Sequence, residues 1–152
     1  MAIAIEILLV EDDPASARLT GEAFEALHDP KVPYHVRIVK DGEEALSFLR
    51  QEPPYANAPR PDLILLDLNL PKVDGKALLA TIKADAELMD IPVIVLSCSS
   101  NPADVKDAYR RQAAGYITKS SDLGEYLTAI RSVRQLWFKV MTLPKAGRAG
   151  TV

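Results

Sequence analysis

Five short apolar segments, separated by amphipathic stretches, limit the possible folds of this chain more than any other feature. They are rich in leucine and β-branched residues, which is typical of strands buried on both faces of a parallel sheet. The expected strands are Ile5–Val10, Tyr34–Val39, Leu63–Leu66, Pro92–Leu96 and Gly115–Lys119. We therefore expect an α/β fold: a doubly wound, five-stranded parallel sheet with helices on both faces.

Residues typical of helix N-termini follow the strands. The pairs are Asp13-Pro14, Asp41-Gly42, Asp74-Gly75 and Asn101-Pro102, and Ser121 or Asp122 opens the last helix. Asp13 precedes a proline directly, so we interpret its carboxylate as an N-cap. The first helix is expected to end near His28. The inward positions expected from helical periodicity are Leu19, Ala23 and Leu27 in the first helix, Val105, Ala108 and Tyr109 in the fourth, and Leu123, Leu127, Ile130, Arg134 and Trp137 in the last.

Composition excludes several classes of protein. A chain of 152 residues with 48% hydrophobic and 26% charged residues fits one globular domain. No apolar segment is long enough to cross a bilayer, and the start of the chain lacks the basic region of a signal peptide. The single cysteine, Cys98, suits a reducing cytoplasm, where we expect it to be a small buried side chain. A net charge of −3 argues against nucleic-acid binding.

Polar residues stand where the expected strands end. Glu11 and Asp12 follow the first strand, Asp67 the third, Ser97 the fourth, and Lys119 ends the fifth. The carboxyl ends of parallel strands meet at one edge of a doubly wound sheet, so these side chains should share a crevice. Each residue alone has an ordinary interpretation, as a turn former, a strand-end hydroxyl or a surface lysine. Only their joint placement is specific.

The chemistry of this set points to phosphoryl transfer. Neighbouring carboxylates at Glu11, Asp12 and Asp67 are costly unless a cation neutralises them, and an oxygen-only set at an open loop favours Mg²⁺. Lys119 can pair with phosphoryl oxygens, and the hydroxyl of Ser97 can donate a hydrogen bond to them. The expected product is an aspartyl phosphate on Asp67.

Two other functions remain open. An aspartate-nucleophile phosphatase usually carries a second acid two residues after its nucleophile, where this chain has Asn69. An adaptor that signals without phosphorylation would not need the complete acid, serine and lysine set. Nucleotide-binding glycine motifs are absent from the sequence, as is the serine elbow of hydrolases.

Several motifs resemble the receiver domain of two-component response regulators, over about Ile5 to Trp137. They are Leu8-Leu9-Val10-Glu11-Asp12-Asp13, Asp67-Leu68-Asn69-Leu70-Pro71, Asp74-Gly75, Val95-Leu96-Ser97 and Tyr116-Ile117-Thr118-Lys119. The resemblance implies that Asp67 is the phosphoacceptor and that Glu11, Asp12, Asp67 and the backbone carbonyl of Asn69 hold Mg²⁺. It implies that Lys119 contacts the phosphoryl group and that Ser97 and Tyr116 form a switch pair. The expected strand order is the flavodoxin-like 2-1-3-4-5.

One position departs from the family pattern. Most receivers carry a proline after the lysine, and this chain carries Ser120. The cis peptide bond common at that position is therefore doubtful here, because cis bonds before other residues are rare.

A narrower resemblance is to single-domain receivers that partner cyanobacterial-type phytochromes. It rests on Tyr55 and Pro59–Leu66, on Lys119-Ser120, and on Trp137-Phe138 followed by Thr142-Leu143-Pro144. It implies a stand-alone regulator without an effector enzyme, with the receiver over 1–140 and a C-terminal extension over 141–152. Its donor would be a sensor histidine kinase, a phytochrome.

The apolar carboxyl end suggests a homodimer. Phe138, Val140, Met141 and Leu143 add apolar surface beyond what one domain needs. We expect the interface to use the fourth helix, the fifth strand, the fifth helix and this segment. The alternative is that the segment folds back onto its own domain.

Overall fold

The computed structural model describes residues 4–25, 33–70, 74–137 and 142–144. Five parallel strands lie in the order β2-β1-β3-β4-β5, so the predicted strand order is confirmed. The elements are β1 (Ile5–Val10), α1 (Pro14–Glu25), β2 (Tyr34–Val39), α2 (Gly42–Leu49), β3 (Leu63–Asp67), α3 (Gly75–Ala84), β4 (Val93–Ser97), α4 (Pro102–Arg110), β5 (Gly115–Thr118) and α5 (Leu123–Gln135).

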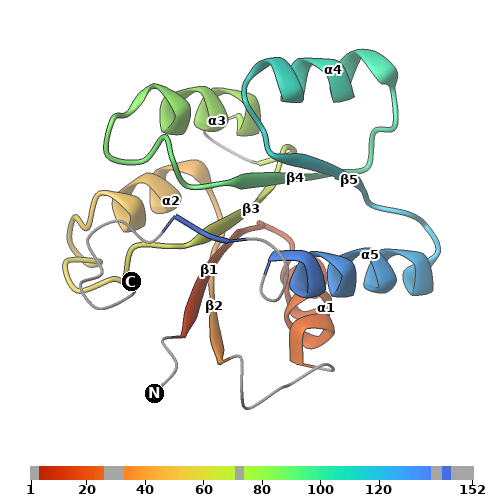
Figure 1. Cartoon of the computed structure of the whole chain (residues 1–152), viewed down its shortest axis with the longest axis horizontal. Coiled ribbons are helices and arrows are strands. Elements are labelled where there is room, and N and C mark those ends of the chain that lie inside the picture. The colour runs from red at the N-terminus through yellow and green to blue at the C-terminus, as the bar shows by residue number, and fades with distance from the viewer. Residues whose placement is uncertain (1–3, 26–32, 71–73, 138–141, 145–152) are drawn as a thin grey trace.

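Helices cover both faces of the sheet (Figure 1). The side chains of α1 and α5 pack with one set of strand residues, including Leu9 and Leu65. The side chains of α2, α3 and α4 pack with the alternate set, including Leu8 and Leu66. Strand β3 is buried at every position and lies in the middle of the sheet, as its uninterrupted apolar sequence predicts.

The strand register brings the carboxyl ends together. Val10 of β1 pairs with Leu66 of β3, so Glu11 and Asp67 follow at the same level. Asp67 in turn pairs with Leu96 of β4, and Ser97 pairs with Thr118 of β5. One edge of the sheet therefore carries all the strand-end residues identified from the sequence.

Side-chain caps begin the helices where the sequence predicts them. Asp41, Asp74, Asn101 and Asp122 each accept a backbone N–H from the first turn of the helix that follows. The carboxylate of Asp13 accepts the Ser16 N–H at 3.3 Å and the Ser16 hydroxyl at 2.8 Å. These bonds identify Asp13 as a cap rather than a metal ligand.

The inward faces of three helices differ from the expected ones. In α1 the buried residues include Thr20 and Phe24 beside Ala23, and Leu19 is only half-buried. In α4 Tyr109 is exposed, and in α5 Leu123 is exposed while Tyr126 is buried. The hydroxyl of Tyr126 bonds to Thr20 at 2.8 Å, a cross-helix contact that hydropathy alone does not reveal. Leu27 and the predicted helix end at His28 lie outside the described residues.

Cys98 corrects another expectation, because its side chain is exposed. It follows Ser97, the last residue of β4, at the point where the chain leaves the sheet. At this point the helices that cover β4 do not enclose the side chain.

The described part of the carboxyl end packs on its own domain. Leu143 is buried in the cluster formed by α1, α5 and one face of the sheet. Phe138, Val140 and Met141 lie outside the described residues. The apolar surface of Leu143 is thus already covered within the chain.

None of the helices in the described ranges combines the length and apolar character that crossing a membrane requires.

Candidate functional site

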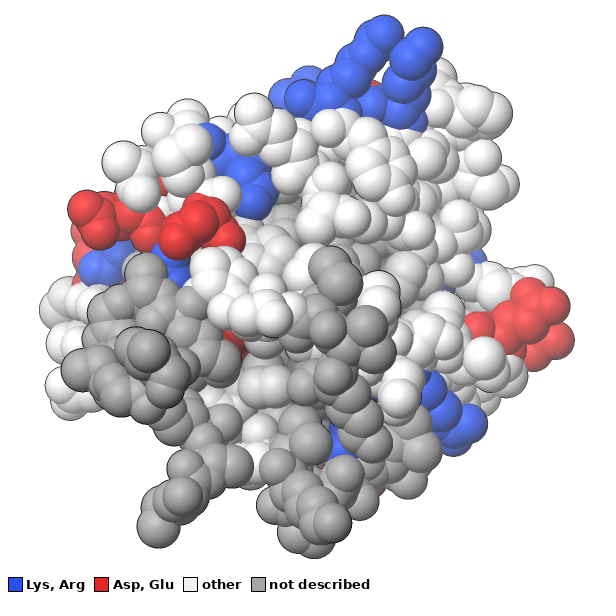
Figure 2. Space-filling model, viewed as in Figure 1, with Lys and Arg blue, Asp and Glu red and all other residues white. Residues whose placement is uncertain are grey.

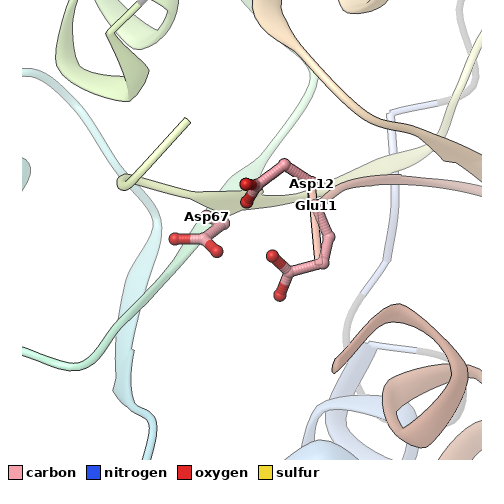
Figure 3. A group of neighbouring side chains, drawn as sticks. All are labelled: Glu11, Asp12 and Asp67. Carbon is pink, nitrogen blue, oxygen red and sulfur yellow. The ribbon is translucent and has the colours of Figure 1, made fainter. Parts of the chain in front are cut away.

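Three carboxylates converge at the carboxyl edge of the sheet (Figure 3). Glu11 and Asp12 leave the end of β1, and Asp67 ends β3. Each offers an oxygen atom, and these atoms all lie within 4.8 Å of one another. Glu11 and Asp67 are buried, whereas Asp12 is exposed. The sequence prediction that these residues meet is therefore confirmed in the structure.

Lys119 joins two of these carboxylates. Its ammonium donates to Glu11 Oε1 at 2.6 Å and to Asp67 Oδ2 at 2.8 Å, and its side chain is only 14% exposed. The backbone N–H of Lys119 bonds to the carbonyl of Ser97 at 2.7 Å, which fixes the base of the side chain at the sheet edge. A charge-assisted pair of this kind is shorter and stronger than a neutral hydrogen bond.

The charged groups of this cluster shift one another's pKa. Burial, and then the neighbouring Asp67, raise the pKa of Glu11 to about 7. Burial also opposes ionisation of Asp67, but hydrogen bonds with Glu11, with Lys119 and from the backbone of Asn69 outweigh it and lower its pKa. The same carboxylates outweigh the burial of Lys119 and raise its pKa. Asp67 is thus held as the carboxylate, the form that can act as a nucleophile.

The donor set fits a divalent cation. Carboxylate oxygens are the ligands that Mg²⁺ prefers, and the exposure of Asp12 leaves room for the water molecules that Mg²⁺ retains. Burial and the neighbouring Asp67 raise the pKa of Glu11, so its carboxylate is costly to ionise there, and a bound cation would reduce that cost. Glu11, Asp12 and Asp67 are therefore the residues that could hold the ion.

Asn69 and Ser97 complete the edge. The backbone N–H of Asn69 donates to Asp67 Oδ1 at 2.9 Å, which orients that carboxylate. Ser97 is buried beside Asp67 on the neighbouring strand, and its Oγ accepts the Ser99 N–H at 3.2 Å. A hydroxyl that accepts this bond still has its own proton to donate.

Tyr116 lies on β5, one strand further from Asp67. Its hydroxyl donates to the backbone carbonyl of Ser99 at 2.7 Å, and its ring packs against the core on the α4 face. Ser97 and Tyr116 thus both contact Ser99. The Lys119–Ser120 peptide bond is trans, and the cis bond within the described ranges joins Pro53 to Pro54.

Gly75 has a structural role that the sequence analysis did not assign. A Cβ at this position would lie 2.6 Å from Leu68 Cα and 2.9 Å from the Asp67 carbonyl oxygen. The start of α3 therefore packs directly on the backbone of the strand that carries Asp67. Ser99 and Lys76 are also absent from the predicted set, because their contacts depend on how α3, α4 and β5 approach one another in space.

A family model for the response regulator receiver domain matches residues 7–131. The chain is 43% identical to the response regulator Rcp1 of Synechocystis sp. over 140 residues, which cover 92% of this chain and 93% of Rcp1.

Solved structures of response regulators also match this chain. The Mn²⁺-bound form of Rcp1 superposes with a TM-score of 0.85 at 41% identity, covering 92% of this chain and 99% of that one. The structure of the phosphorylated cyanobacterial phytochrome response regulator RcpA superposes with a TM-score of 0.86 at 48% identity. The match covers 93% of this chain and 99% of that one.

Proposed function

Because the chain belongs to the response regulator receiver domain family, we propose that it is a stand-alone response regulator that accepts a phosphoryl group on Asp67. The observation that carries this proposal is the position of Asp67, a buried carboxylate held by Lys119 beside two further acids. In this proposal the regulator signals by contact with other proteins.

In this proposal each residue of the site has a defined role. The Asp67 carboxylate attacks the phosphorus of a phosphohistidine, a bond forms from its oxygen to phosphorus, and the bond from phosphorus to the histidine nitrogen breaks. Lys119 and the hydroxyl of Ser97 donate to the transferred oxygens, and Tyr116 follows the movement of that hydroxyl. The modification adds nearly two negative charges, which makes the site a switch.

We propose Mg²⁺ as the cation, held by Glu11, Asp12, Asp67 and the backbone carbonyl of Asn69. When bound, the ion neutralises charge on the carboxylates and on the phosphoryl oxygens. The Mn²⁺ ion reported for Rcp1 supports a divalent ion in this family.

Binding of Mg²⁺ is expected to strengthen as pH rises from about 6 to about 8. In the metal-free protein the pKa of Glu11 is raised to about 7, so below that pH its carboxyl holds a proton that the cation must displace. The dissociation constant should fall by up to about tenfold per pH unit below the pKa and level off above it.

Isothermal titration calorimetry in buffers of different ionisation enthalpy measures the released proton. Glu11→Gln should bind Mg²⁺ more weakly, with little change in affinity over this pH range. If wild-type protein binds Mg²⁺ with the same affinity throughout and releases no proton, this account of Glu11 is wrong.

We propose that the donor is a phytochrome-type sensor histidine kinase. RcpA, at 48% identity, is a phytochrome response regulator, and this supports the assignment. In a side-by-side assay with several phosphorylated kinases, a phytochrome kinase should transfer fastest. Faster transfer from a kinase of another class would contradict this partner, and no transfer from any of them would count against the receiver function.

We further propose a homodimer through α4, β5 and α5. A groove of about 460 Å³ opens on this face, and it is lined by Tyr109, Tyr116 and Trp137 among others. Figure 2 shows basic side chains over α4 and acidic ones beside the start of α5, with uncharged surface between them. Two copies related by a two-fold axis could pair these opposite charges. Sedimentation velocity tests the proposal. A protein that is monomeric both without and with a phosphoryl mimic would contradict it.

A further inference from the structure

Ser99, in the loop between β4 and α4, contacts three parts of the molecule at once. Its backbone N–H donates to Ser97 Oγ at 3.2 Å, and its carbonyl accepts the Tyr116 hydroxyl at 2.7 Å. Its side-chain hydroxyl donates to Asp104 Oδ2 at 2.5 Å and accepts the Asn101 N–H at 3.2 Å. The residue is half-buried, so these bonds are partly shielded from water.

The contacts extend from α4 to α3. The other oxygen of Asp104 lies 3.7 Å from the ammonium of Lys76, which also lies 3.9 Å from Asp107. Lys76 follows Gly75, the residue packed against the backbone of Asp67. A continuous set of contacts thus runs from Ser97 through Ser99 and α4 to the start of α3.

We infer that Ser99 is a positioning residue that couples the hydroxyl of Ser97 to the first turn of α4. This inference rests on the proposed phosphorylation of Asp67. If the Ser97 hydroxyl turns toward a phosphoryl group, the bond that it accepts from Ser99 changes, and the Ser99 backbone must adjust. Because the Ser99 hydroxyl holds Asp104, that adjustment moves α4 with it.

The side chain of Ser99 carries this coupling separately from its backbone. Alanine at this position keeps the N–H and the carbonyl, so the contacts with Ser97 and Tyr116 remain possible. It removes the bonds to Asp104 and Asn101, which attach the loop to α4. The Lys76 ion pairs are partly exposed, so we expect them to add little on their own.

Trp137 offers a reporter of movement in α4. It is the single tryptophan in the chain, and it lines the groove that Tyr109 of α4 also lines. A shift of α4 therefore changes the surroundings of the indole. Beryllofluoride with Mg²⁺, a phosphoryl mimic, provides the stimulus, and binding and tryptophan emission can be measured separately in the same sample.

Wild-type protein is expected to bind the mimic and to change its Trp137 emission. Ser99→Ala should still bind it, with an affinity reduced by no more than about fivefold, the lower end of allosteric coupling, but should lose most of the emission change. Ser99→Thr, which keeps a hydroxyl, should restore the change. Ser100→Ala, at the exposed neighbouring serine, should behave as wild type.

Three results would overturn the inference. The first is an emission change in Ser99→Ala equal to that of wild type. The second is a wild-type emission that stays constant while the mimic binds. The third is a loss of binding in Ser99→Ala, which would place Ser99 in the site itself. Failure of the wild-type protein to bind the mimic at all is a different result. It would overturn the proposed function, and the coupling with it.

Discussion

Asp67→Asn is expected to form no acyl phosphate when incubated with Mg²⁺ and acetyl phosphate. The amide of asparagine is not a nucleophile, and the other two acids of the site cannot replace it. Glu11 has a pKa raised to about 7 and is bonded to Lys119, and Asp12 is exposed to solvent. Asparagine is close in size to aspartate and can still accept the Asn69 N–H, so the fold should be retained.

Intact mass spectrometry measures this directly. Wild-type protein should gain one phosphoryl group and Asp67→Asn none. Asp74→Asn is a matched control, because Asp74 is an exposed carboxylate at the same edge and asparagine caps a helix as well as aspartate does. A phosphoryl group on Asp67→Asn, stable under the same conditions as that on wild type, would exclude Asp67 as the acceptor.

Lys119→Met is expected to slow phosphorylation by about 10²- to 10³-fold. Among the described residues, Lys119 is the one lysine whose ammonium donates a hydrogen bond to Asp67. Loss of a single preorganised donor to the charge that develops in a transition state slows a reaction by about this factor. Methionine keeps a similar length but has no charge. Lys106→Met, on the exposed side of α4, should phosphorylate at the wild-type rate.

The same substitution should also change stability. Without Lys119, Glu11 and Asp67 are neighbouring buried carboxylates with no cation. When both stay charged, this lowers the free energy of unfolding by about 3–5 kcal/mol. Uptake of a proton by Glu11 reduces this cost, so the loss should be smaller at low pH, and added Mg²⁺ should offset it. Urea unfolding at two pH values, with and without Mg²⁺, tests this. Equal stability of the variant and wild type under all four conditions would contradict the role of Lys119 in neutralising Glu11 and Asp67.

Much of the fold and the position of the site could be predicted from the sequence. The apolar segments locate the strands because strands covered on both faces have no polar side. In a parallel sheet, that alone places Glu11, Asp67 and Ser97 at one edge. The Asp-Gly and Asn-Pro pairs locate the helix starts because capping is a local interaction.

Other features depend on contacts between distant segments. The bridge from Lys119 to both Glu11 and Asp67 joins the ends of β5, β1 and β3, so no local pattern encodes it. The burial of Tyr126 instead of Leu123 depends on a hydroxyl partner on α1. Ser99 is one of several serines after β4, and only the approach of α4 and β5 distinguishes it.

The central claim is that the carboxylates at this edge hold a divalent cation beside a phosphoryl acceptor. A crystal structure with Mg²⁺ and beryllofluoride tests it most directly. The account predicts beryllofluoride on the Asp67 carboxylate, Mg²⁺ bound by Glu11, Asp12 and Asp67, and the ammonium of Lys119 on a fluoride. A structure from saturating conditions with no ion among these three acids, and with Lys119 still joined to Glu11 and Asp67, would contradict it.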